Sequence, residues 1–366
     1  MRRLVFWEPT VSPHKLDWIR QVQAQPEVAA CTYISDAPLR RERVELGWSV
    51  DEDSDIEMIV APTPERIRGV FAEYPEAVHV FSGLRQVPAI VEGLKRAVRS
   101  GARFGLCSEP RVLEGGAGKV RLLQSWLTEG HLRRRAEFVL AIGTNGPLWF
   151  RLAGYPAARI FPFGYLVDPL RPVVVSMPAD RRPTIAYVGR LVSEKGVDAF
   201  LRAAEQLPEF DKLFVGKGAL EADILAVAAR DPTIRFLGVV PREEIAGVFE
   251  VADILVLPSR TTSDGWGVVV SEAIMSGCFA IVSHFAGASL AIADTTLGAT
   301  LATVDADAIV EAARGARRRG LLDEEHQLKR REWGKRELSA RAGARQFLAI
   351  LEACEQGVAP PSWPHA

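Results

Sequence analysis

One short stretch of the sequence combines carboxylates, glycines and an aromatic residue in a pattern that packing alone does not require. In DGWGVVVSE, residues 264–272, the residues that could bind a ligand or take part in chemistry are Asp264, Gly265, Trp266, Gly267 and Glu272. The glycines let backbone amides approach a ligand closely. A helix that begins at Val268 and ends at Gly277 would carry Glu272 a little over one turn from its start, within reach of a ligand hydroxyl. Taken alone, the two acids also fit a helix cap and a solvated glutamate.

Two cations stand in a comparable position earlier in the chain. The segment TIAYVGRLVSEKG is typical of a strand that ends at Gly189, followed by Arg190, Lys195 and a helix that starts near Gly196. A planar guanidinium, a point charge and the free amides of a helix start together suit a diphosphate. A surface loop with ordinary charges is the alternative, but the acids of the 264–272 stretch favour a ligand site.

Two further glycine-rich segments are less specific. KLFVGKGALE places Gly216 and Gly218 around Lys217, without the third glycine of a dinucleotide fingerprint, so a tight turn explains it equally well. EGGAGKV resembles a phosphate-binding P-loop, but Val120 occupies the place of the Ser or Thr that binds Mg²⁺. We expect residues 114–120 to form a mobile loop that faces an acceptor.

The elements that would position these residues alternate between short apolar runs and amphipathic stretches. The predicted strands are residues 4–7, 28–34, 77–81, 103–107, 138–142, 159–163, 184–189, 212–216, 234–238, 252–258 and 279–283. Alternation of this kind predicts parallel βαβ units, and a proline-rich break at 164–183 predicts two Rossmann-like domains with a cleft between them. Ligands bind at the carboxyl ends of parallel strands. This rule selects the second-domain loops, among them LGVVPRE with Val240.

Composition limits the class of protein. The 366 residues carry a formal charge of −1, which argues against a nucleic-acid partner. Four scattered cysteines favour reduced thiols, and no apolar run is long enough for a signal peptide or a membrane span, so we expect a cytoplasmic protein. The densest basic run, residues 133–135, is read first as a solvated helix face and second as a contact with an anionic membrane.

The order of the motifs VGRL-x3-KG, VGKG, FLG, ADILVLPS and DGWGVVVSEA-x3-G resembles the donor half of GT-B glycosyltransferases, specifically glycosyltransferase family 4. Residues 184–290 carry most of the resemblance. It implies residues 1–165 as an acceptor-binding domain, 166–183 as a linker, 184–335 as a nucleotide-sugar domain, and 336–366 as a helix that crosses back. It also implies retaining transfer of a hexose from a UDP- or GDP-sugar, with no metal and no other cofactor.

The resemblance assigns roles to particular residues. Arg190 and Lys195 would hold the diphosphate, Asp264 would act with them in catalysis, and Glu272 would bind the ribose. Further donor contacts are expected from Gly189, Gly216, Val240, Gly265, Trp266, Gly267 and Val268. The chain departs from the family in having Asp264 where a Glu is usual, and in lacking a His at the end of the strand RFGLC. Glu109 and His14 are candidates for contacts with the acceptor or the donor sugar.

Several functions remain compatible with the sequence. The first is a transferase that acts on a glycan or lipid-linked acceptor in bacterial surface polysaccharide biosynthesis, with peripheral contact to the inner membrane. A nucleotide-sugar 2-epimerase of the same fold would need no acceptor. A binding module with a degenerate site would bind nucleotide without turnover. A dehydrogenase is disfavoured, because no G-x-G-x-x-G follows a strand.

Overall fold

The structure, a computed structural model, describes residues 1–44, 56–173, 181–262, 264–292, 294–360 and 362–364. The chain divides into two units, one formed by residues 1–168 and 340–363 and the other by residues 169–339. The predicted boundaries at 165 and 335 lie a few residues before these divisions. Residues 174–180 of the predicted linker lie outside the described residues.

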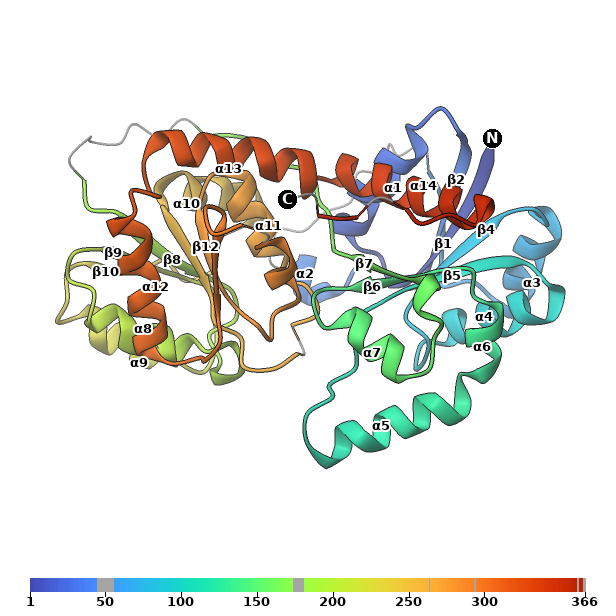
Figure 1. The fold of residues 1–366 in the computed structure, drawn as a ribbon, viewed down its shortest axis with the longest axis horizontal. Helices are drawn as coiled ribbons and strands as arrows, with labels where there is room; N and C mark the ends of the chain where they lie inside the picture. Colours follow the sequence, from blue (N-terminus) through green and yellow to red (C-terminus); the bar gives the residue numbers. More distant parts are fainter. Residues whose placement is uncertain (45–55, 174–180, 263, 293, 361, 365–366) are drawn as a thin grey trace. The chain divides into compact units, whose positions relative to one another are not determined.

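The first unit is built on a parallel sheet with the strand order β3-β2-β1-β4-β5-β6-β7 (Figure 1). Its strands are β1 (Arg2–Thr10), β2 (Val28–Ala37), β3 (Glu57–Val60), β4 (Val78–Ser82), β5 (Arg103–Ser108), β6 (Val139–Ile142) and β7 (Ile160–Phe163). The central strands are buried apolar runs, as expected for a sheet that is covered on both faces. The strand order reverses between β1 and β4, and ligands of open α/β sheets bind at such a switch point.

The helices of the first unit begin and end with recognisable local signals. They are α1 (Pro13–Gln23), α2 (Arg41–Val44), α3 (Pro64–Glu73), α4 (Pro88–Ser100), α5 (Gly115–Thr128), α6 (Gly130–Arg135), α7 (Gly146–Leu152), the 3-10 turn η1 (Ala157–Arg159) and α14 (Ala340–Gln356). Pro13, Pro64 and Pro88 open their helices, and Gly101 ends α4 in the left-handed conformation.

The carboxyl-terminal helix α14 belongs to the first unit and packs against α1 (Figure 1). Phe347 is fully buried, with ring centroids 5.3 Å from Trp18, 5.9 Å from Phe138 and 6.0 Å from Phe6. This aromatic cluster joins residues from both ends of the chain. The first unit therefore contains α14 as a component of its core.

The second unit has a parallel sheet with the order β10-β9-β8-β11-β12-β13. Its strands are β8 (Thr184–Val188), β9 (Asp211–Val215), β10 (Ile234–Phe236), β11 (Ile254–Leu257), β12 (Phe279–Ser283) and β13 (Gly298–Leu301). Its helices are η2 (Ser193–Lys195), α8 (Val197–Glu205), α9 (Glu221–Ala228), η3 (Arg242–Glu244), α10 (Ile245–Val251), α11 (Val268–Met275), η4 (Gly287–Ala291), α12 (Ala306–Arg318) and α13 (Glu324–Glu337). The switch point lies between β8 and β11.

The structure differs from the sequence-based expectations in three places. Strands β3 and β13 were not predicted; both lie at a sheet edge, where short and partly exposed strands lack a continuous apolar run. The predicted mobile loop at 114–120 is wrong, because residues from Gly115 onward form α5. The segment 336–366, predicted as one helix, begins with the last residues of α13 and continues as α14, with a break at Leu338 and Ser339.

Candidate functional site

The predicted cation Lys195 and the predicted acid Asp264 meet at the switch point of the second sheet. Lys195 lies in η2 after β8, and Asp264 follows β11, so neighbouring strands bring them together. The Lys195 Nζ lies 2.7 Å from Asp264 Oδ1, and both side chains are largely shielded, at 14% and 17% exposed. Ser259 Oγ donates a hydrogen bond of 2.6 Å to Asp264 Oδ2. The carboxylate is thus held from two sides.

The turn that carries Lys195 is itself anchored. Arg260 Nη1 donates to the Ser193 carbonyl oxygen at 2.9 Å, and its two terminal nitrogens lie 2.6 and 2.8 Å from the carboxylate oxygens of Asp198 in α8. A bidentate guanidinium–carboxylate pair fixes geometry as well as charge. Arg260 therefore ties the segment after β11 to the segment after β8. The sequence analysis did not single out Arg260 or Asp198.

Arg190 is placed differently from Lys195. Its side chain is exposed, and it makes no hydrogen bond or ion pair with the residues that the structure describes. Its backbone carbonyl accepts a 2.7 Å hydrogen bond from the Tyr187 hydroxyl. Burial raises the pKa of Tyr187, the Asp264 carboxylate raises it further, and Arg190 opposes the rise. The pKa of Tyr187 therefore responds to both Asp264 and Arg190. Because its side chain is exposed, Arg190 is a cation available to a ligand at this edge of the sheet.

Glycines let the loops after β8, β9 and β11 pack backbone against backbone. A Cβ at Gly216 would lie 1.9 Å from the carbonyl oxygen of Gly189, and one at Gly196 would lie 2.0 Å from that of Pro258. Gly216 N–H donates to the Gly238 carbonyl at 2.7 Å. The loops after β8, β9 and β11 therefore pack so closely that no side chain fits between them. Gly189 and Gly216, predicted as donor contacts, have a clear packing role.

The side chain of Trp266 points into the unit. It is 1% exposed, and its Nε1 donates a 3.0 Å hydrogen bond to Ser271 Oγ in α11. Its backbone carbonyl accepts from Ala288 N–H at 2.7 Å. Gly267 follows with φ of +93° and caps α11, which begins at Val268. The aromatic residue thus anchors the turn, while the first N–H groups of α11 lack intrahelical acceptors, as at any helix start.

Glu272 is buried on α11 and pairs with a residue that the sequence analysis missed. Its Oε1 lies 2.7 Å from Arg242 Nη1, and its side chain is 7% exposed. Burial raises the pKa of Glu272, and Arg242 opposes the rise. Arg242 starts η3, two residues after the half-buried Val240. The loop LGVVPRE was already selected as a strand-end loop, so its Arg was the available signal.

The predicted first-domain candidates, His14 and Glu109, both belong to the first unit. His14 is at the start of α1, and Glu109 follows β5 directly with an exposed side chain. Burial raises the pKa of Tyr165, and Glu109 beside it raises it further. These residues follow strands β1, β5 and β7, so they share one edge of the first sheet.

A buried polar cluster that was not predicted lies at the switch point of the first sheet. Lys15 Nζ is 3.4 Å from Glu8 Oε1, 3.2 Å from Ser82 Oγ and 3.4 Å from Cys107 Sγ. Ser82 Oγ donates to Glu8 Oε1 at 2.5 Å. Burial raises the pKa of Glu8, while Lys15 and Ser82 oppose the rise. The signal for it in the sequence was polar residues at the ends of three strands, β1, β4 and β5.

With this geometry described, comparison with known proteins identifies the second unit. Residues 182–316 match the family model described as Glycosyl transferases group 1. These residues are a group 1 glycosyltransferase domain. The match covers all six strands of the second sheet and includes Lys195, Arg242, Asp264 and Glu272.

Curated relatives match the same part of the chain. The D-inositol 3-phosphate glycosyltransferase of Mycolicibacterium smegmatis is 31% identical over 134 residues, which is 34% of this chain and 30% of the relative. A GDP-mannose-dependent monoacylated alpha-(1-6)-phosphatidylinositol monomannoside mannosyltransferase of Corynebacterium glutamicum is 30% identical over 142 residues, 36% of this chain and 37% of the relative. The matched segment thus spans about a third of the length of these relatives.

Solved structures resemble nearly the whole chain. Anabaena Alr3699/HepE in complex with UDP aligns with a TM-score of 0.70 and 14% identity, covering 96% of this chain and 100% of that one. Sucrose-phosphate synthase from Thermosynechococcus elongatus aligns at 0.67 with 16% identity, covering 98% and 100%. The predicted GT-B fold is confirmed, with a Rossmann-like sheet in each unit. The group 1 domain is one half of that fold.

The described residues contain neither a metal-ligand cluster nor a membrane-spanning helix. We find no cluster of three or more His, Cys, Asp or Glu side chains arranged as metal ligands in that part of the chain. Among the same residues, no helix combines the length and apolarity needed to traverse a bilayer.

Proposed function

We propose that this chain is a retaining glycosyltransferase that moves a hexose from a UDP- or GDP-sugar to a hydroxyl of a glycan or lipid-linked acceptor. The supporting observation is the Lys195–Asp264 pair at the switch point of a group 1 glycosyltransferase domain, 2.7 Å apart and largely shielded from water. Similarity to a GDP-mannose-dependent mannosyltransferase and to a fold that binds UDP in HepE agrees with a nucleotide-sugar donor.

In this proposal the diphosphate of the donor lies between Arg190 and Lys195, near the start of α11. The bond between the anomeric carbon and the phosphate oxygen breaks, and a bond from that carbon to the acceptor oxygen forms on the same face. The acceptor proton passes to the leaving phosphate. The cations and the helix start stabilise the charge that develops on the diphosphate, so neither a metal nor another cofactor is needed.

The remaining residues have supporting roles. Glu272, held by Arg242, would bind the ribose, and Asp264 would contact hydroxyls of the sugar. Residues 1–165 would bind the acceptor, with His14 and Glu109 at the carboxyl edge of the first sheet. Transfer to a lipid-linked acceptor in bacterial surface polysaccharide biosynthesis would require the protein to act in the cytoplasm, in peripheral contact with the inner membrane.

The test starts with a thermal-shift panel of UDP- and GDP-sugars, followed by an assay of nucleoside diphosphate release with candidate acceptors. Lys195→Ala and Arg190→Ala should each lower turnover by about 10²- to 10³-fold, because each removes a preorganised charge from the leaving group. Arg230→Ala is the matched control, since Arg230 is 69% exposed and pairs only at the surface with Glu205. Its turnover should equal that of the wild type.

Unchanged turnover in both Lys195→Ala and Arg190→Ala would overturn the assignment. The assay also separates the other functions. Isomerisation of the donor in the absence of any acceptor would indicate a 2-epimerase. Nucleotide binding with no turnover on any acceptor would indicate a binding module.

A further inference from the structure

Helix α5 of the first unit exposes its large apolar side chains. Val120, Leu123, Trp126 and Leu127 are 68%, 58%, 56% and 66% exposed. Side chains three or four residues apart share a helix face, so Val120, Leu123 and Leu127 form a stripe. A soluble helix normally turns such a stripe toward the core. In α5 the residues that face the protein are Leu122, which packs against the core of the unit, and small or polar residues such as the buried Gly118 and Ser125.

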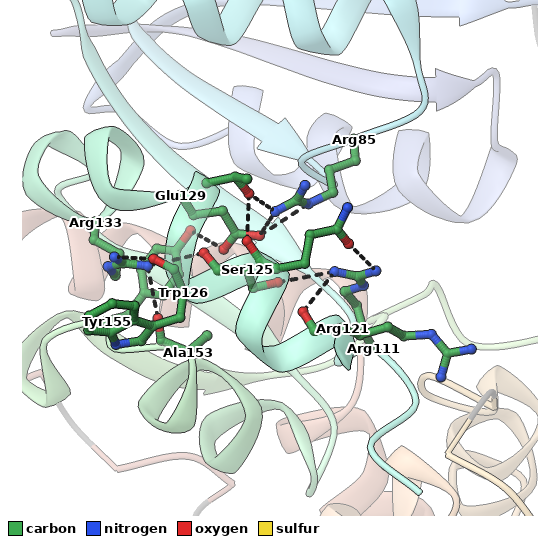
Figure 2. A network of polar contacts seen from close by, with 11 residues as sticks. Arg85, Arg111, Arg121, Ser125, Trp126, Glu129, Arg133, Ala153 and Tyr155 are labelled. Atoms are coloured by element: carbon green, nitrogen blue, oxygen red, sulfur yellow. Dashed lines mark hydrogen bonds and ion pairs between the residues drawn. The ribbon is translucent and has the colours of Figure 1, made fainter. Parts of the chain in front are cut away.

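A polar network fixes this orientation (Figure 2). Arg111 Nη1 donates to Ser125 Oγ at 3.1 Å and to the Arg121 carbonyl at 3.2 Å. Arg121 Nη1 donates to the Val112 carbonyl at 3.1 Å, so this cation is used internally. At Gly118 a Cβ would lie 1.9 Å from the Leu113 carbonyl oxygen, which shows how closely the helix approaches the preceding chain. Rotation of α5 to bury its apolar stripe would break all of these contacts.

The carboxyl end of α5 is held in the same way (Figure 2). Arg133 donates to the carbonyl oxygens of Ser125, Trp126 and Ala153, at 3.2, 2.7 and 3.0 Å. Ala153 directly follows α7, whose Leu148 and Leu152 are each 45% exposed. The Arg133 side chain therefore links α5 to α7, and the two helices together present six exposed apolar side chains.

The segment that carries most of this surface is basic, although the whole chain carries −1. Residues 115–135 contain five basic residues, Lys119, Arg121, Arg133, Arg134 and Arg135. Their single acid, Glu129, is buried and is occupied by Arg85 at 2.8 Å and by the Tyr155 hydroxyl at 3.0 Å. Lys119, Arg134 and Arg135 are exposed. Basic residues thus outnumber acids in this segment, with the exposed Glu114 directly before it, and an apolar stripe in a basic segment complements a surface that is apolar beneath an anionic layer.

We infer that this surface, defined by Val120, Leu123, Trp126, Leu127, Leu148 and Leu152, docks on a lipid bilayer that contains anionic headgroups. The apolar side chains enter the region below the headgroups, where Trp is favoured, and Lys119, Arg134 and Arg135 meet the headgroup phosphates. The protein lies on the bilayer and does not span it. This inference rests on the membrane contact of the proposed function and assigns it to a surface of the first unit, but its test needs neither the donor site nor transfer.

Flotation of the full chain with vesicles tests the inference without substrate. We expect binding to vesicles of phosphatidylglycerol and phosphatidylcholine in equal parts, weaker binding to phosphatidylcholine alone, and weakening by salt. The double variant Leu123→Ser/Leu127→Ser should lower partitioning about tenfold or more, because two exposed side chains lose their apolar contact. Lys119→Glu should lower it only on the anionic vesicles.

The matched control is Leu225→Ser/Leu328→Ser, which changes two side chains of the second unit that are 50% and 51% exposed. It should bind vesicles as the wild type does. Both double variants should keep the wild-type melting temperature and nucleotide binding, since all four positions are exposed. Equal partitioning of the wild type and Leu123→Ser/Leu127→Ser, or no binding to either vesicle, would overturn the inference. Self-association in light scattering that this variant abolishes would overturn it in favour of a homodimer.

Discussion

At the residue scale, Asp264 is a residue at which the proposed site differs from the pattern that the sequence resembles, and its contacts give the difference a physical meaning. Its carboxylate neutralises Lys195 at 2.7 Å and accepts from Ser259 at 2.6 Å. Aspartate is one methylene shorter than the usual glutamate, and here it reaches the cation within its own domain. In the proposed donor site this carboxylate would compete with a diphosphate for the same ammonium group.

This competition predicts that binding and turnover respond in opposite directions to Asp264→Asn. Loss of the negative charge frees Lys195, so UDP or GDP should bind about threefold to tenfold more tightly in calorimetry. Turnover should fall about 10- to 100-fold, because the sugar hydroxyls lose a charged acceptor. Asp264→Glu keeps the charge and is the control. Weaker nucleotide binding by Asp264→Asn would contradict the competition.

Glu272 and Arg242 show a related arrangement inside the second unit. The pair is partly desolvated, since the side chain of Glu272 is 7% exposed and that of Arg242 is 23% exposed. Removal of either partner therefore leaves an unpaired charge that water solvates poorly. Arg242 acts by holding Glu272 in place. It is therefore a positioning residue in the proposed ribose site.

At the element scale, the site depends on loops that pack without side chains between them. Gly216 has φ of +134°, and a Cβ there would lie 1.9 Å from the Gly189 carbonyl oxygen. The loop after β8 carries Arg190 and Lys195, so any displacement of Gly189 moves the two side chains proposed to bind the diphosphate. The backbone contact between two loops thus positions charges on one of them.

We predict that Gly216→Ala destabilises the protein by about 1–3 kcal/mol and weakens nucleotide binding at least tenfold, because the loop after β8 must move. Thermal unfolding and calorimetry with UDP or GDP measure the two effects. Gly247→Ala in α10 is the control: a Cβ there meets no atom within 4 Å, and alanine favours a helix by about 0.5–1 kcal/mol. Equal nucleotide affinity in the two variants would argue against this role of Gly216.

At the scale of the whole molecule, stability in acid depends on a buried histidine. His79 is 0% exposed in the core of the first unit, where its Nδ1 accepts from Trp7 Nε1 at 3.1 Å and its ring stacks 4.3 Å from that of Phe71. Burial lowers the pKa of His79 to about 3. The unfolded chain takes up this proton below about pH 6.5, whereas the folded chain resists it until about pH 3.

Stability from this group is therefore complete above about pH 6.5 and is lost as the pH falls toward 3. We predict a loss of about 2 kcal/mol at pH 5 relative to neutral pH, from about 1.4 kcal/mol per pH unit. His79→Gln keeps an acceptor for Trp7 without titrating, so its stability should fall less between these pH values. Urea unfolding of both proteins at each pH gives the comparison. Parallel losses in both would exclude His79 as the cause.

The sequence by itself determined the local elements and the composition of the site. Apolar runs predicted most strands, because this signal acts between residues a few positions apart. The pattern of charges and glycines selected Arg190, Lys195, Asp264 and Glu272, and the family resemblance assigned their roles. Edge strands β3 and β13 were not predicted, because a strand with a neighbour on one side only is partly exposed and lacks a continuous apolar run.

Only the tertiary structure decided which of these residues meet. The Lys195–Asp264 and Arg242–Glu272 pairs, and the cluster of Glu8 and Lys15, form because sheet topology brings distant strand ends to one edge. It also decided that α5 turns its apolar side outward, since Arg111 and Arg133 from outside the helix fix its rotation. Local periodicity reports which face of a helix is apolar; what covers that face is set by the contacts of the rest of the chain.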